Sequence, residues 1–201
     1  PVIDAPSEGE AQAAYIVSKG KAFAIVSQDY DSLLYGAEKV IQNLTISTRK
    51  KKPNSLTYQT VKPRILSLSE SLNKLGIDKD QLIILSILIG TDYNLGGIKG
   101  IGPKKALELV RKYGSNFDSL FKGVNWDDYF PFPWTTVFYT IKKMKVTEEY
   151  SLEWTDINEK ELLNLLVNEH DFSRERVMGV IKKLNKDKEK RQQKGIYDFL
   201  N

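Results

Sequence analysis

The apolar positions change their spacing along the chain, from short runs in the first third to helical periodicity afterwards. Residues 1–4 are typical of the end of a buried strand, apolar residues follow at helical spacing from 13 to 17, and residues 22–26 form a second short apolar run. A strand, a helix and a strand in this order predict a right-handed crossover and a partly parallel sheet. We therefore expect an α/β fold, and a chain that begins within a domain.

The remaining elements follow from the same patterns. Another strand is expected at residues 40–45, followed by a basic, turn-rich loop at 49–55 and a partly alternating pattern at 56–66. From about Ser69 onward the period is helical, so the second half is expected to be almost all α. Helices are predicted at residues 69–75, 78–89, 103–113, 116–121, 134–143, 158–168 and 173–185.

The composition allows a buried core and limits the available chemistry. The chain has 201 residues, 41% of them hydrophobic. It has no apolar run of about eighteen residues and no charged-then-apolar leader, so we expect an intracellular protein, cytoplasmic or, in a eukaryote, nuclear, with no membrane partner. Cysteine is absent, so oxygen ligands or the single histidine, His170, would have to hold a metal. That favours a hard cation.

The charge is concentrated near one end. The net charge is +4, but residues 182–194 carry seven cations and two acids, which leaves the rest of the chain close to neutral. A charged run near a terminus is more often solvated than functional. The charge alone therefore leaves the partner open.

Acidic residues lie at the ends of the predicted elements. Glu8 and Glu10 lie at a helix start, Asp29 and Asp31 follow a predicted buried strand, and Asp92 follows an apolar helix. The structural alternative is a capping box from Ser7 to Glu10 and turn-capping by the two aspartates. Together the five acids would form a cluster without a lysine or arginine close in sequence, and such a cluster repels itself unless cations fill it.

This cluster has the composition that magnesium-dependent phosphodiester hydrolysis requires. Two ions can bridge a scissile phosphate, one generating hydroxide and the other stabilising the leaving oxygen, while the protein supplies acidic ligands. A histidine base is not needed. His170, in a late helical region, is more readily interpreted as a surface or capping residue.

The stretch from residue 96 to 106 joins two predicted helices by a glycine-rich turn. Gly100 and Gly102 would let backbone amides approach a phosphate, and Lys99, Lys104 and Lys105 would add charge without reading bases. Ordinary helix capping is the alternative for a bare glycine turn. Isoleucines within the turn favour a packed helix-hairpin-helix.

Three segments carry a family resemblance: residues 4–11, 27–33, and 89–94 followed by the glycine hairpin. They resemble the internal nuclease region of flap endonucleases, most closely the archaeal ones. The resemblance implies a mostly parallel, PIN-like nuclease core with a helix-hairpin-helix and a helical carboxyl-terminal region. It also implies that two Mg²⁺ ions, or Mn²⁺ in their place, bind to Glu8, Glu10, Asp29, Asp31 and Asp92.

The same resemblance implies that the hairpin grips duplex DNA through Lys99, Gly100, Gly102, Lys104 and Lys105. A K⁺ ion bound by hairpin carbonyls would lie near Ile98 and Ile101. Family members carry an earlier region with further aspartates and a helical arch, which these residues do not include. We therefore expect this chain to correspond to the carboxyl-terminal portion, with an incomplete catalytic apparatus.

The last residues resemble the peptide by which replication proteins bind the sliding clamp (PCNA). Gln193 is followed by Ile196, Phe199 and Leu200, and Leu200 stands where a second aromatic residue is usual. A frayed terminus is the alternative. Three large apolar residues after a charged run favour a clamp-binding peptide.

These observations divide the chain into four predicted segments: an internal part of the nuclease core (1–77), a helix-hairpin-helix region (78–125), a helical region (126–185) and a basic tail with the clamp-binding peptide (186–201). The leading hypothesis is a structure-specific 5′ flap endonuclease and 5′-3′ exonuclease that acts on branched or nicked DNA in replication and repair. The alternative is a non-catalytic module that binds DNA and tethers it to the clamp. A ribonuclease is a third hypothesis, which the predicted grip on duplex DNA disfavours.

Overall fold

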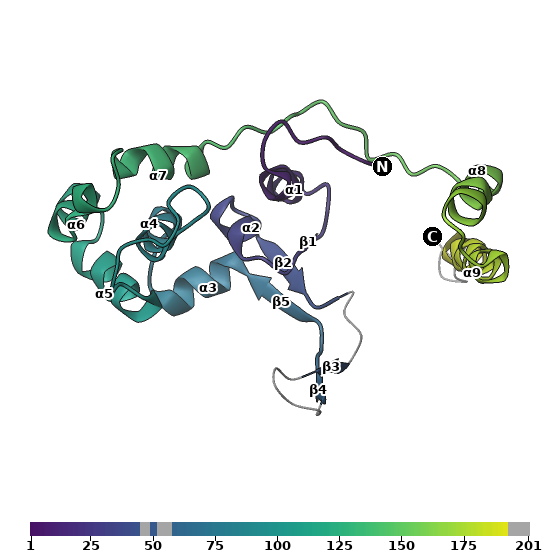
Figure 1. The fold of residues 1–201 in the computed structure, drawn as a ribbon, viewed down its shortest axis with the longest axis horizontal. Coiled ribbons are helices and arrows are strands. Elements are labelled where there is room, and N and C mark those ends of the chain that lie inside the picture. The colour runs from purple at the N-terminus through teal and green to yellow at the C-terminus, as the bar shows by residue number, and fades with distance from the viewer. Residues whose placement is uncertain (45–48, 52–57, 193–201) are drawn as a thin grey trace, which may run out of the picture. The chain divides into compact units, whose positions relative to one another are not determined.

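The computed structural model describes residues 1–44, 49–51 and 58–192. The chain divides into two compact units, one formed by Val2–Tyr150 and the other beginning at Ser151 (Figure 1). The four segments predicted from the sequence stay a prediction beside this division.

The first unit contains a small mixed sheet. Its strands β1 (Ile25–Val26), β2 (Lys39–Gln42) and β5 (Arg64–Ser67) lie in the order β1-β2-β5, with β1 parallel and β5 antiparallel to β2 (Figure 1). A separate antiparallel pair consists of β3 (Arg49–Lys51) and β4 (Tyr58–Thr60). The predicted α/β class is confirmed, and the three-stranded sheet has one parallel and one antiparallel pairing.

One face of the three-stranded sheet is buried. Ile25, Val40 and Leu66 pair across the strands, and each is at most 8% exposed. They pack with Ala14 of helix α1 (Gly9–Ser18) and Leu33 of helix α2 (Asp31–Leu34). The predicted strand–helix pattern therefore produces a real core, on one side of the sheet.

The other face carries a second apolar row. Val26, Ile41 and Ile65 occupy the next position of each strand and are paired with one another, and alternate residues of a strand point to opposite faces. Val26 is 48% exposed and Ile65 is 59% exposed. We call these three residues the open-face row.

The strand predicted at residues 1–4 is wrong. These residues are described and have no strand structure, and Val2 is 93% exposed. A strand exists through hydrogen bonds to a neighbour. An apolar run alone therefore does not define one.

Helices dominate the unit from residue 68 onward, as predicted. They are α3 (Leu68–Leu75), α4 (Lys79–Ile89), α5 (Pro103–Tyr113), α6 (Phe117–Gly123) and α7 (Trp134–Lys142), with a short 3₁₀ helix, η1 (Trp126–Asp128), before the last. Helix α4 is their centre. Its Ile83, Ile84, Ile87 and Leu88 are fully buried and pack with the apolar residues of the surrounding helices.

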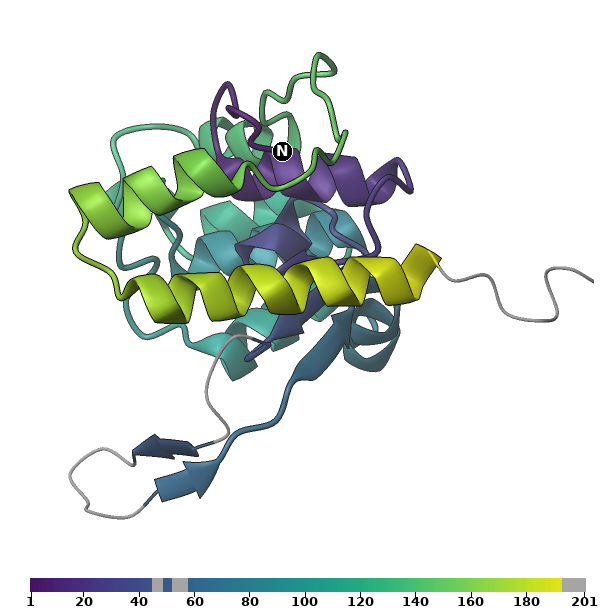
Figure 2. The same cartoon turned by 90° about the vertical axis from the view of Figure 1, so that its right-hand side faces the viewer.

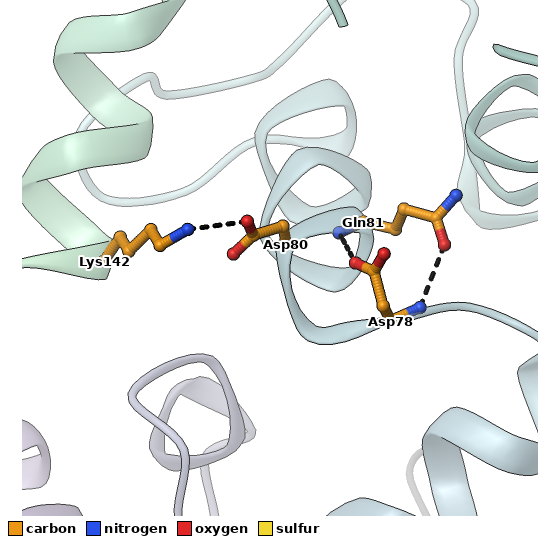
Figure 3. A network of polar contacts seen from close by, with 4 residues as sticks. All are labelled: Asp78, Asp80, Gln81 and Lys142. Carbon is orange, nitrogen blue, oxygen red and sulfur yellow. Dashed lines mark hydrogen bonds and ion pairs between the residues drawn. The ribbon is translucent and has the colours of Figure 1, made fainter. Parts of the chain in front are cut away.

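The start of α4 is fixed by polar contacts. Asp78 accepts a hydrogen bond from the Gln81 amide, and the Gln81 side chain accepts one from the Asp78 amide, which completes a capping box (Figure 3). Lys142 of α7 lies 2.6 Å from Asp80, which joins the two helices in an exposed ion pair. Such a pair contributes up to about 1 kcal/mol.

The second unit is helical. Helix α8 (Glu159–Leu163) continues into a π-helical turn, η2 (Asn164–Glu169), and α9 (Arg174–Gln192) follows. Helices α8 and α9 lie side by side as a hairpin (Figure 2). Both were predicted, although α9 extends farther than expected. In the part of the chain that the structure describes, no helix has the length and hydropathy needed to cross a membrane.

The predicted clamp-binding residues Gln193, Ile196, Phe199 and Leu200 lie outside the described residues. The clamp peptide therefore stays a prediction.

Candidate functional site

The five predicted carboxylates line one pocket. It has a volume of about 170 Å³ and is formed by the start of α1, the loop between β1 and α2, and the loop after α4. Aromatic and apolar residues complete its wall. The lining residues are Glu8, Glu10, Asp29, Asp31, Leu34, Tyr35, Thr91, Asp92, Tyr93 and Ile141.

The capping box proposed as an alternative for the first two acids does not form. Helix α1 begins at Gly9 with Glu8 in the capping position and no side-chain cap. The Ser7 hydroxyl contacts the sulfur of Met144 at 3.1 Å. Glu10 accepts a hydrogen bond from the Ser27 hydroxyl at 2.5 Å. The side chains of the two glutamates therefore do not form a capping box at the start of the helix.

Ser27 connects two walls of the pocket. Besides donating to Glu10, its oxygen accepts a hydrogen bond from the Asp29 amide at 3.1 Å. This fixes the turn after β1 that carries Asp29 and Asp31. The side chain of Asp31 does not cap α2, because the capping position is Tyr30 and no side-chain cap bond forms there. The sequence showed no signal for this role of Ser27.

The pocket is electrostatically unbalanced. Although part of Asp31 faces solvent, burial of its carboxyl raises its pKa, and the negative charges of the other four acids raise it further, in the order Glu10, Asp92, Asp29 and Glu8. None of the described residues that line the pocket is a lysine or arginine. The other four carboxylates therefore disfavour ionisation of Asp31.

This donor set fits a divalent cation. Hard cations prefer several carboxylate oxygens, and a cation would relieve the repulsion that raises the Asp31 pKa. Among the described residues, no three or more Asp, Glu or His side chains are arranged so that they could already hold a metal ion.

The loop that carries Asp92 is held by a buried asparagine. Asn94 is 2% exposed. Its side-chain amide donates to the Ile87 carbonyl at 2.7 Å, and its side-chain oxygen accepts from the Thr91 amide at 3.2 Å and from the Thr91 hydroxyl at 2.6 Å. Asn94 was part of the recognised sequence segment, but a structural role was not predicted for it.

The same loop closes on itself through two glycines. Gly90 and Gly97 have φ angles of 120° and 56°, which favour glycine. A Cβ at Gly90 would lie 2.8 Å from the Gly97 nitrogen, and one at Gly97 would overlap the backbone of Ile89. The backbone at the end of α4 therefore touches the start of the hairpin.

Helix α1 is fastened to a distant segment by a buried glutamine. Gln12 is 3% exposed. Its side chain donates to the Thr147 carbonyl at 2.9 Å and accepts from the Thr147 amide at 2.7 Å. Gln12 lies one turn after Glu8, so this contact orients the helix that carries both glutamates.

The glycine hairpin forms as predicted between α4 and α5. The Ile98 amide donates to the Leu88 carbonyl at 2.9 Å, and the Ile101 amide donates to the Ile98 carbonyl at 3.0 Å. Both isoleucines are buried, at 4% and 8% exposure. The candidate DNA-binding residues are all exposed and lie on the turn or at the start of α5: Lys99, Gly100, Gly102, Lys104 and Lys105. The K⁺ site near the two isoleucines stays a prediction.

Known proteins resemble this chain in sequence. The XPG I-region family matches residues 1–92. Flap endonuclease 1 of Staphylothermus marinus is 49% identical over 186 residues, which cover 92% of this chain and 53% of that protein. Flap endonuclease 1 of Pyrococcus horikoshii is 49% identical over 190 residues, covering 92% and 52%.

Over the part that it spans, this chain is similar to flap endonucleases. The structure of flap endonuclease-1 from Methanococcus jannaschii is similar, with a TM-score of 0.74, 41% identity, and coverage of 90% of this chain and 51% of that one. The chain spans about half the length of the curated relatives it matches, and this fits the predicted carboxyl-terminal portion.

A more distant structure has the same fold. The catalytic core of Rad2 in complex with a DNA substrate matches with a TM-score of 0.70 at 21% identity, covering 92% of this chain and 63% of that one. The recognition made from three short motifs is therefore confirmed at the level of sequence and fold. The roles of the individual flap endonuclease residues stay predictions.

Proposed function

We propose that this chain supplies the cation pocket and the DNA grip of a structure-specific 5′ nuclease. Its reaction would be hydrolysis of branched or nicked DNA, as a 5′ flap endonuclease and 5′-3′ exonuclease in replication and repair inside the cell. The observation that carries the proposal is the gathering of five carboxylates around one pocket, in which none of the described lining residues is a lysine or arginine. Relatives named flap endonuclease 1, at 49% identity, support it.

The pocket acids would hold the cofactor. Glu8 and Glu10 from α1, Asp29 and Asp31 from the turn after β1, and Asp92 from the loop after α4 approach from three directions. We assign them two Mg²⁺ ions, with Mn²⁺ as a substitute; when bound, such ions generate hydroxide from water and stabilise the leaving oxygen. The chain's own residues orient these acids: Ser27 holds Glu10 and the Asp29 turn, and Asn94 holds the Asp92 loop.

The hairpin would hold the duplex beside the pocket. Lys99, Lys104 and Lys105 are exposed, and the backbone amides at the start of α5 have no side-chain cap, because Gly102 occupies the capping position. These contacts would reach phosphates and not base edges. A K⁺ ion near Ile98 and Ile101 and a sliding clamp bound through residues 193–200 belong to the same proposal. Deletion of 193–201 should remove clamp stimulation and leave basal cutting unchanged.

The test is calorimetric titration of Mg²⁺ together with cleavage of a labelled 5′ flap. Asp29→Asn should weaken Mg²⁺ binding and cutting while flap binding persists, since the hairpin is untouched. Asp128→Asn is the matched control, because it removes the same charge from an exposed position outside the pocket. Equal Mg²⁺ binding by both variants would contradict the metal assignment. Absence of Mg²⁺ binding by the parent would favour the non-catalytic module.

A further inference from the structure

Two tyrosines form a hydrogen-bonded chain that ends on Glu8. The Tyr93 hydroxyl donates to Oε1 of Glu8 at 3.2 Å. The hydroxyl oxygens of Tyr93 and Tyr35 are also 3.2 Å apart. Tyr35 lies just after α2, Tyr93 lies in the loop after α4, and Glu8 starts α1, so the chain joins all three walls of the pocket.

The direction of the chain follows from the number of protons. A carboxylate only accepts hydrogen bonds, and a phenol has one proton to donate. Tyr93 uses its proton on Glu8, so Tyr35 must donate to the oxygen of Tyr93. Hydrogen bonds arranged in this head-to-tail manner strengthen one another.

Both phenols keep their protons at neutral pH. Burial raises the pKa of Tyr35, and its hydrogen bond to Tyr93 raises it further. Burial also raises the pKa of Tyr93, against the opposing effect of the Tyr35 hydrogen bond, and the Glu8 charge adds to the rise. Both hydroxyls therefore have a proton with which to donate these hydrogen bonds.

We propose that Tyr93 and Tyr35 are positioning residues that fix the Glu8 carboxylate for cation binding. The inference rests on the proposed function, because it concerns the same pocket. Tyr93 is adjacent to Asp92 and bonds to Glu8, which lies 85 residues away in sequence. One side chain thus sets the separation between two of the acids. Tyr35 acts through Tyr93, since its hydroxyl restricts where the Tyr93 hydroxyl can lie.

The packing role of the two tyrosines depends on their rings and not on their hydroxyls. The ring of Tyr35 packs in both apolar clusters of the first unit, and the ring of Tyr93 packs against the helical one. Phenylalanine would preserve those ring contacts at both positions. Removal of the hydroxyl alone therefore separates the orientation of Glu8 from packing of the core.

The experiment measures Mn²⁺ affinity by electron paramagnetic resonance, with thermal unfolding as a check on folding. Tyr93→Phe should weaken Mn²⁺ binding about 10-fold, the lower end of the range for a group that orients a metal ligand. Tyr35→Phe should weaken it by a smaller factor. The double variant should match Tyr93→Phe, because Tyr35 has no separate route to Glu8. Tyr15→Phe, which removes a hydroxyl bonded to exposed Glu148, should leave Mn²⁺ affinity unchanged.

A Glu8→Gln background distinguishes this inference from the proposed function. In that background Tyr93→Phe should cause no further loss of affinity. Parent-like Mn²⁺ affinity in Tyr93→Phe, a continuing Tyr93→Phe effect in Glu8→Gln, or an equal loss in Tyr15→Phe would overturn the positioning role. Parent-like affinity in Glu8→Gln, or no binding by the parent, would instead overturn the ligand assignment on which it rests.

Discussion

Asp31 shows at the residue scale how gathering carboxylates in one pocket destabilises the folded protein. Its pKa is raised, so the folded state holds the Asp31 proton more tightly than the unfolded state. Stability therefore falls as pH rises from the usual aspartate range through the raised pKa, and it stays lower at neutral pH. Asp31→Asn should raise the stability of the cation-free protein at pH 7, by less than about 1 kcal/mol for a partly exposed group.

Thermal unfolding in a chelator, at pH 7 and at pH 3, measures this effect. The advantage of Asp31→Asn should shrink at pH 3, where the carboxyl is protonated in both states. Added Mg²⁺ should reverse the order of stability at pH 7, since the cation stabilises the parent by binding the folded state. An equal advantage at both pH values would contradict electrostatic repulsion as the cause.

The buried side chain of Gln12 should contribute to stability through its two hydrogen bonds to Thr147. Gln12→Ala would leave the partly buried amide and carbonyl of Thr147 without their side-chain partner, at a cost of about 1–3 kcal/mol. Chemical denaturation measures the change. Gln28→Ala, at an exposed position, should change stability little. If the two variants unfold alike, the Gln12 contact does not hold α1.

At the scale of elements, the hairpin and α5 should carry the salt dependence of DNA binding. Each phosphate contact that a lysine loses should reduce the slope of log K against log salt by about 0.9. Lys104→Ala with Lys105→Ala should therefore lower that slope by up to about 1.8 for every flap sequence alike. Fluorescence anisotropy at several salt concentrations measures it.

The matched control is Lys74→Ala with Lys122→Ala, two exposed lysines at the ends of α3 and α6. The control has the same change in net charge. A slope that falls equally in both double variants would mean that overall charge, and not the hairpin, governs binding.

The sequence predicted well those elements whose boundaries are determined by residues close to them in the chain. The Asp78–Gln81 capping box and the Pro103 and Gly114 boundaries lie within a few residues of the helix they define. The strand at residues 1–4 failed because pairing depends on a neighbour that local pattern does not specify. The five acids that line the pocket were singled out by residue type and by their places at the ends of predicted elements. Their supports were not, since Tyr93 and Glu8 are 85 residues apart and Gln12 and Thr147 are 135 apart.

On the scale of the whole molecule, the open-face row should govern self-association. Val26, Ile41 and Ile65 are apolar, and two of them are about half exposed or more. Sheets with parallel strands usually have both faces covered. The chain alone should therefore associate as its concentration rises, and Ile65→Lys should suppress this. Leu95→Lys, at a 79% exposed position outside the row, should not. Sedimentation velocity measures the self-association of both variants. If Ile65→Lys and Leu95→Lys associate to the same extent, the open-face row is not the surface responsible.

The contact between Gly90 and Gly97 has a consequence for how the protein would choose a cleavage position. The loop between these glycines carries Asp92 on one side, and the hairpin follows on the other. Under the proposed function, this backbone contact would keep the two ends of the loop together when DNA binds. Under the proposed function, the phosphate at the hairpin and the phosphate at the acids would be separated by a distance built into the backbone. The protein would then cut at a constant distance from the duplex phosphate that the hairpin holds, whatever the base sequence.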